Sequence, residues 1–125
     1  MTTAEAAPII DESQVLSKAV LKAASLLDLN HAKLARILGL SASTVSRMSG
    51  GHYALSQGRK EWELSVLFLR LFRSLDSITG GRESDARAWL HSKNAALTGV
   101  PANIMESIQG LIRVVDYLDA VRGRV

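Results

Sequence analysis

The 125-residue sequence contains no cysteine, which excludes a disulfide framework and any zinc site with thiolate ligands. Its first residues, Met1 to Pro8, hold no basic cluster that leads into an apolar run, and no segment is apolar for long enough to span a membrane. We therefore expect a cytoplasmic protein without a signal peptide. Because 47% of the residues are hydrophobic, the chain can bury the core of one compact domain or of two small units.

Enzyme motifs are also missing. The three histidines, His31, His52 and His91, are far apart in the sequence and match no metal-ligand or catalytic-triad spacing. The glycine pairs follow expected helices and lack the lysine and hydroxyl residues of a phosphate-binding loop. We expect a protein that is not an enzyme, with no cofactor and no metal site.

The alternating pattern of β-strands is absent as well, whereas apolar residues recur at helical spacing. We expect an all-α fold with helices at about 13–27, 31–38, 42–49, 61–79, 85–92 and 111–122, and short helical turns at 94–99 and after Pro101. Ser13, Asn30 and Ser84 are the expected N-caps, Gly39 ends the second helix, and Gly110 precedes the last one. The expected inward stripe of that last helix is Leu111, Ile112, Val115 and Leu118.

The segment 61–79 carries apolar side chains on nearly all sides, from Trp62 to Leu75. Such a helix either lies at the centre of the fold, wrapped by other helices, or exposes an apolar patch through which the protein associates. We favour the exposed patch and predict a homodimer through this helix. Trp62 and Trp89 are expected to anchor the core, since each lies on an apolar helical face.

Acidic residues are absent from one window of thirty residues, although the net charge of the chain is only +3. Residues 31–60 contain five basic residues, Lys33, Arg36, Arg47, Arg59 and Lys60, and no aspartate or glutamate. Concentrated positive charge favours a polyanionic partner such as DNA. On charge alone, a solvated basic surface explains the window equally well.

The same window has the spacing of a helix-turn-helix, in the sequence HAKLARILGLSASTVSRMSG from His31 to Gly50. Gly39 permits the turn, while Val45 and Met48 face the core. The outward face of the second helix then presents Ser41, Ser43, Thr44, Ser46 and Arg47 to operator DNA, with Arg47 the best candidate to contact a guanine. Lys33, Arg59 and Lys60 are expected to contact the DNA backbone, and a dimer would bind two half-sites. An ordinary helical corner is the alternative.

The stretch from Asp85 to Val125 resembles the toxin-binding domain of the Xre/MbcA/ParS antitoxin family. The resemblance rests on Ala88, Trp89 and Leu90, on Asn94 with Ala96, Leu97 and Gly99, on Pro101, on Gly110, and on the ending VVDYLDAVRGRV. That family has an Xre-like helix-turn-helix before this domain. The resemblance therefore implies a flexible N-terminus at 1–12, an Xre-like domain at 13–79 and a toxin-binding domain at 80–125.

Membership would imply an antitoxin that neutralises a RES-domain toxin and represses its own operon. The toxin would be an enzyme that consumes NAD or transfers ADP-ribose from it. Membership also implies that Arg122, Gly123, Arg124 and Val125 obstruct the active site of the toxin, while Trp89, Asn94, Gly99 and Pro101 hold the toxin-binding surface in shape. The two arginines also suit a helix C-terminus for electrostatic reasons. A stand-alone dimeric helix-turn-helix repressor is the alternative function.

Overall fold

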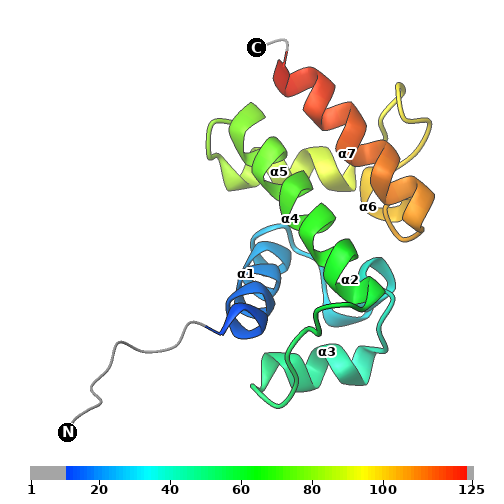
Figure 1. The fold of residues 1–125 in the computed structure, drawn as a ribbon. Helices are drawn as coiled ribbons and strands as arrows, with labels where there is room; N and C mark the ends of the chain where they lie inside the picture. The colour runs from blue at the N-terminus through cyan, green and yellow to red at the C-terminus, as the bar shows by residue number, and fades with distance from the viewer. Residues whose placement is uncertain (1–10, 124–125) are drawn as a thin grey trace, which may run out of the picture.

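The structure, a computed structural model, describes residues 11–123, and these form seven helices and no strand (Figure 1). The helices are α1 (Glu12–Leu26), α2 (His31–Leu38), α3 (Ala42–Ser49), α4 (Lys60–Ile78), α5 (Glu83–His91), α6 (Pro101–Ile104) and α7 (Ile108–Gly123). The expected all-α class is confirmed. None of the helices in the described range is long and apolar enough to cross a membrane.

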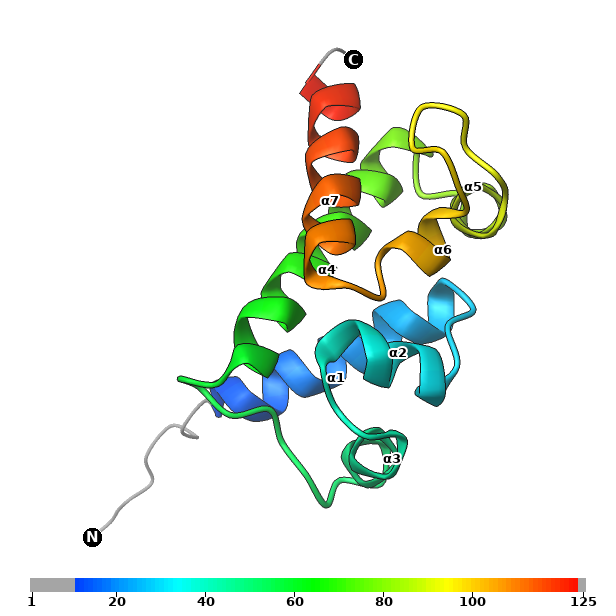
Figure 2. The same cartoon turned by 90° about the vertical axis from the view of Figure 1, so that its right-hand side faces the viewer.

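The long helix α4 runs through the whole molecule, with α1 to α3 at its beginning and α5 to α7 at its end (Figures 1 and 2). It packs against α1, α2, α5 and α7, and it buries Phe68, Leu71 and Leu75 completely or nearly so. Val66, which is 49% exposed, is the only large apolar residue of α4 whose side chain is classed as exposed rather than buried or half-buried. Of the two explanations for the apolar surplus of this helix, the central position is therefore the one observed, and both halves of the chain share one hydrophobic core.

Two of the three expected N-caps, Ser13 and Ser84, are wrong. Helix α1 is capped by Asp11, whose carboxylate accepts hydrogen bonds from the backbone N–H groups of Ser13 (3.0 Å) and Gln14 (3.3 Å). A carboxylate at this position also interacts favourably with the helix dipole, so the helix begins before Ser13. Helix α5 follows Arg82 without a side-chain cap and includes Ser84, because acidic residues already occupy its first turn.

The expected helical turn at 94–99 is an irregular loop instead. The backbone groups of Asn94 and Gly99 pair with each other at 2.8 and 3.2 Å, which closes the segment as an isolated antiparallel bridge. Inside the loop, Asn94 Oδ1 accepts a hydrogen bond from the N–H of Leu97 at 3.1 Å. The Asn94 side chain thus satisfies a backbone group inside the loop, and Pro101 is the first residue of α6, the short helical segment that the sequence predicts there.

The last helix begins earlier than expected, so that Gly110 lies inside α7. A Cβ atom at this position would lie only 1.8 Å from the carbonyl oxygen of Ile104, which is the last residue of α6. Glycine is therefore required for the close approach of two backbones rather than for a helix boundary. The expected apolar stripe is correct for Leu111, Val115 and Leu118, but Ile112 is 43% exposed.

Candidate functional site

The turn between α2 and α3 has the helix-turn-helix geometry that the sequence predicts. Asn30 caps α2 by accepting a hydrogen bond from the N–H of Lys33 at 2.8 Å, and Gly39 ends it with a left-handed φ of 70°. Val45 and Met48 on α3 are buried in the core. Helix α3 is therefore held by one face and leaves the other free.

The free face of α3 presents Ser43, Ser46 and Arg47 to solvent. Ser41 is the N-cap of α3: its hydroxyl accepts a hydrogen bond from the N–H of Thr44 at 3.1 Å and contacts the Thr44 hydroxyl at 2.8 Å. Ser41 and Thr44 are therefore engaged in holding the helix start. The Ser43 hydroxyl also contacts Ser41, at 3.1 Å, but Ser43, Ser46 and Arg47 remain exposed to a partner. Hydroxyls and a guanidinium are suitable groups for DNA phosphates and base edges.

Arg47 is oriented by groups that the sequence did not reveal. Its guanidinium lies 5.8 Å from the ring centroid of Tyr53, within range of a cation–π interaction, and bonds the Thr44 hydroxyl at 3.3 Å. The Tyr53 hydroxyl donates to Glu61 Oε2 at 2.5 Å, and burial, followed by this hydrogen bond, raises the pKa of Tyr53. The same Glu61 oxygen accepts the N–H of Ser56 at 2.8 Å. The buried Glu61 carboxylate thus fixes the loop that supports Arg47.

The other basic residues of the window differ in their surroundings. Lys33 Nζ lies 2.7 Å from Glu106 Oε2 and also donates to the side chain of Asn103, so a contact with a DNA phosphate would have to compete with these bonds. Lys60 forms an exposed ion pair with Glu63 at 3.4 Å. Arg59 is exposed immediately before α4.

Glu106, in the turn between α6 and α7, connects the two halves of the chain. Its second carboxylate oxygen accepts a hydrogen bond from Arg36 Nε at 2.7 Å. The hydrogen bond with Lys33 is the main cause that lowers the pKa of Glu106, and Arg36 adds to it. A second connection is made on α7, where Asp119 contacts Arg70 at 2.5 Å and Ser74 at 2.8 Å, both on α4.

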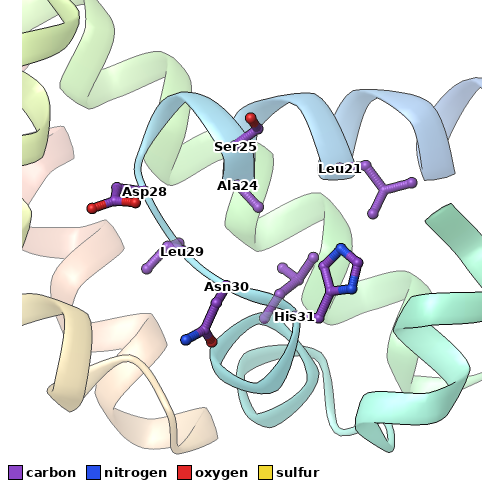
Figure 3. Close-up of a pocket in the computed structure, with 8 residues that line it drawn as sticks. Leu21, Ala24, Ser25, Asp28, Leu29, Asn30 and His31 are labelled. Carbon is purple, nitrogen blue, oxygen red and sulfur yellow. The ribbon is translucent and has the colours of Figure 1, made fainter.

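A pocket of about 400 Å³ lies where α1 ends and α2 begins (Figure 3). Its wall combines apolar side chains such as Leu21 with polar ones, including Asp28 and His31. No group of metal-binding side chains gathers in this pocket or elsewhere within residues 11–123. The Asn30 side chain, which also lines this pocket, accepts the capping hydrogen bond of α2. The pocket is therefore formed by the turn between α1 and α2, which sets the position of the helix-turn-helix.

The C-terminal half is organised by contacts between its own segments. Trp89 on α5 stacks on Tyr117 on α7, with ring centroids 6.2 Å apart, and both rings are half-buried against the core. Arg113 donates to the carbonyl oxygen of Leu97 at 2.6 Å and thereby attaches the 94–99 loop to α7. Gly99 lets this loop approach Ile104, since a Cβ there would lie 3.3 Å from the Ile104 side chain.

The two surfaces expected to bind partners lie at opposite ends of the molecule. Figure 1 shows α3 at the bottom and the end of α7 at the top. Arg122 and Gly123 are exposed in the last turn of α7, whereas Arg124 and Val125 lie outside the described residues. A partner at the end of α7 would therefore leave α3 accessible.

Comparison with known proteins gives matches along nearly the whole chain. The model of the antitoxin Xre-like helix-turn-helix domain matches residues 9–70, and that of the antitoxin Xre/MbcA/ParS C-terminal toxin-binding domain matches residues 74–124. Among solved structures, a chain of the M. tuberculosis MbcT–MbcA toxin–antitoxin complex is similar in fold, with a TM-score of 0.65 and 22% identity over 89% of this chain and 96% of that chain. No curated protein matches the sequence.

Proposed function

This chain is an antitoxin of the Xre/MbcA/ParS family with a helix-turn-helix domain, and we propose that it neutralises a RES-domain toxin and represses its own operon. The RES toxin would consume NAD or transfer ADP-ribose from it, and the C-terminal residues 122–125 would block its active site. The similarity in fold to a chain of the MbcT–MbcA toxin–antitoxin complex supports a toxin of that kind.

The observation that carries the proposal is the separation of two unlike surfaces. One end presents Ser43, Ser46 and Arg47 on α3, and the other presents Arg122 at the end of α7. An exposed arginine in the last turn of a helix is suited to paired hydrogen bonds with carboxylates or phosphates in the pocket of a partner. DNA and toxin would then bind the same molecule at different ends.

We expect the deletion of residues 122–125 to weaken toxin inhibition while leaving operator binding unchanged. The concentration of antitoxin that halves NAD consumption by the toxin encoded beside it should rise about tenfold or more. Lys93→Ala, which removes another exposed positive charge from the same half, is the control and should inhibit like the wild type. Equal inhibition by the truncated chain would disprove the active-site block.

The matching change at the other end is Arg47→Ala. It should cost about 1–3 kcal/mol of specific operator binding, measured by fluorescence anisotropy, and leave toxin inhibition unaltered. An unchanged operator affinity would show that α3 does not read the bases. If Arg47→Ala weakens operator binding but the wild type inhibits no toxin, the chain acts as a stand-alone repressor.

We also propose that the antitoxin binds its operator as a homodimer. Two copies of the helix-turn-helix would contact two half-sites about one helical turn apart. The sequence predicts association through residues 61–79, but most of the apolar surface of α4 is covered by the chain itself. Part of the apolar surface of α4 that remains accessible, at Trp62 and Phe72, lines a groove beside α1.

A further inference from the structure

We infer that a second copy of this chain binds in the groove between α1 and α4, with the two α1 helices packed antiparallel across a two-fold axis. The inference rests on the proposed homodimer and specifies its surface. The groove consists of two adjoining cavities of about 310 and 290 Å³, which share Ala19, Leu69 and Arg73. Its walls are mainly apolar and include Val15, Leu16, Trp62 and Phe72.

The groove contains apolar surface that the monomer leaves accessible. Val15 is 58% exposed, the most exposed large apolar side chain among the described residues. Leu16, Trp62 and Phe72 are only partly buried, although each packs against the core. Removing such apolar surface from water is the main driving force of association, at about 25 cal/mol for each Å².

The residues of α1 that face the groove follow the spacing of a helix-packing seam. Glu12, Val15, Ala19 and Lys22 are separated by three, four and three residues, so they lie on one side of the helix. When a copy of α1 is placed antiparallel with Glu12 opposite Lys22, the same register places Val15 opposite Ala19. A large side chain then meets a small one, which permits close packing.

Charge complementarity selects a second copy of this chain as the occupant. The groove has a carboxylate at one end, Glu12, and the bases Lys22 and Arg73 farther along, so the surface complements itself after a two-fold rotation. Within residues 11–123, none of these three side chains forms an ion pair. In the dimer, Glu12 of each copy would pair with Lys22 of the other.

The position of α1 agrees with DNA binding by such a dimer. Figure 1 shows α1 on the opposite flank from α7, and Figure 2 shows it running across the direction that joins α3 to the end of α7. A two-fold axis along that direction, beside α1, makes the two α1 helices antiparallel. The same axis places α3 of both copies at one end of the dimer, where they can contact one DNA duplex.

The test is a charge exchange, read out by sedimentation equilibrium of the full chain. The wild type should form a dimer of twice the 13.5 kDa chain mass, and Glu12→Lys or Lys22→Glu alone should raise the dimer dissociation constant about tenfold or more. The double variant should return it to the wild-type range. Glu12 and Lys22 are both exposed, so the fold is not at risk, and Ile112→Ser on the exposed side of α7, away from the groove, is a control that should dimerise normally.

Several results would overturn the inference. These are a wild type that stays monomeric at about 100 µM, a dimer that is insensitive to both single changes, and a double variant that is not rescued. A chain that dimerises only after removal of residues 2–10 would assign the groove to that segment. Loss of toxin inhibition by Glu12→Lys with an unchanged dimer dissociation constant would assign it to the toxin. Failure of the proposed function looks different, because the wild type would then dimerise without inhibiting a toxin.

Discussion

The helix-turn-helix of α2 and α3 is organised by residues close together in the sequence, whereas the C-terminal helices α5 to α7 depend on contacts between separate segments. In the first region, the Asn30 side chain accepts a hydrogen bond from the N–H of Lys33, three positions later, and the Ser41 hydroxyl accepts one from the N–H of Thr44. In the second, Trp89 stacks on Tyr117, and Arg113 bonds the carbonyl of Leu97. A short sequence motif can therefore specify the first surface but not the second.

This difference matters for how each surface responds to mutation. The recognition face of α3 depends on a short helix with its own cap and two buried anchors, Val45 and Met48. The shape of the C-terminal half depends on a loop, a four-residue helix and α7 fitting closely together. Changes at the contacts between those segments should therefore have the largest effects on stability.

The largest effect is expected for Gly110→Ala. The added methyl group would lie 1.8 Å from the Ile104 carbonyl oxygen, so α6 and α7 must move apart. We expect the free energy of unfolding to fall by about 3 kcal/mol or more, and the melting temperature by roughly 10 °C, measured by circular dichroism. Gly123→Ala, where a Cβ meets no atom within 4 Å, is the matched control and should melt like the wild type. A Gly110→Ala chain of normal stability would mean that the C-terminal half tolerates separation of its segments.

Much of the helix-turn-helix could be predicted because its determinants are local. The cap at Asn30, the left-handed turn at Gly39 and the burial of Val45 and Met48 all follow from residue type and spacing over a few positions. The start of α1 was missed by the same reasoning, because Ser13 and Asp11 are both good caps and only the structure shows which one the helix uses.

The rest could not be predicted because it depends on distant residues. The window 31–60 contains no acidic residue, but in the fold the carboxylate of Glu106 pairs with Arg36. Glu106 lies 70 positions after Arg36, so the charge pattern along the sequence does not reveal this contact. The sequence places Gly110 at a helix boundary, because its contact with the backbone of Ile104 becomes apparent only in the fold. Tyr53 lies in a polar loop with no periodic pattern, so nothing in the sequence connects it with Arg47.

A pair of matched asparagine caps compares the two regions directly. Asn30 Oδ1 accepts the N–H of Lys33 at 2.8 Å, and Asn94 Oδ1 accepts the N–H of Leu97 at 3.1 Å. Asn30→Ala should lower the free energy of unfolding by about 1 kcal/mol, as is usual for a helix cap. Asn94→Ala should cost more, about 1–2 kcal/mol, because it also loosens the loop that Arg113 attaches to α7.

Urea denaturation of the two asparagine variants measures this difference. The Ser variant at each position keeps a hydroxyl acceptor and should recover part of the loss. If Asn30→Ala lowered the free energy of unfolding more than Asn94→Ala, the contrast would be wrong: the C-terminal half would not depend more than the helix-turn-helix on contacts between separate segments.

The smallest effect is expected for Glu106→Gln, which breaks the link between the two regions. Its carboxylate is 25% exposed, so its ion pairs with Lys33 and Arg36 should contribute only about 0.5–1 kcal/mol at neutral pH. Because folding lowers the pKa of Glu106 below 4.5, this stability is present above pH 4.5 and is lost as the pH falls through the folded-state pKa. The difference in unfolding free energy between the wild type and Glu106→Gln should therefore shrink in that acidic range, as measured by urea denaturation from pH 7 downwards. Glu63→Gln, in an exposed pair within α4, is the control and should show almost no difference at any pH. A difference for Glu106→Gln that stays constant below pH 4.5 would mean that Glu106 acts through packing rather than charge, and that the two halves are joined mainly by the apolar core around α4.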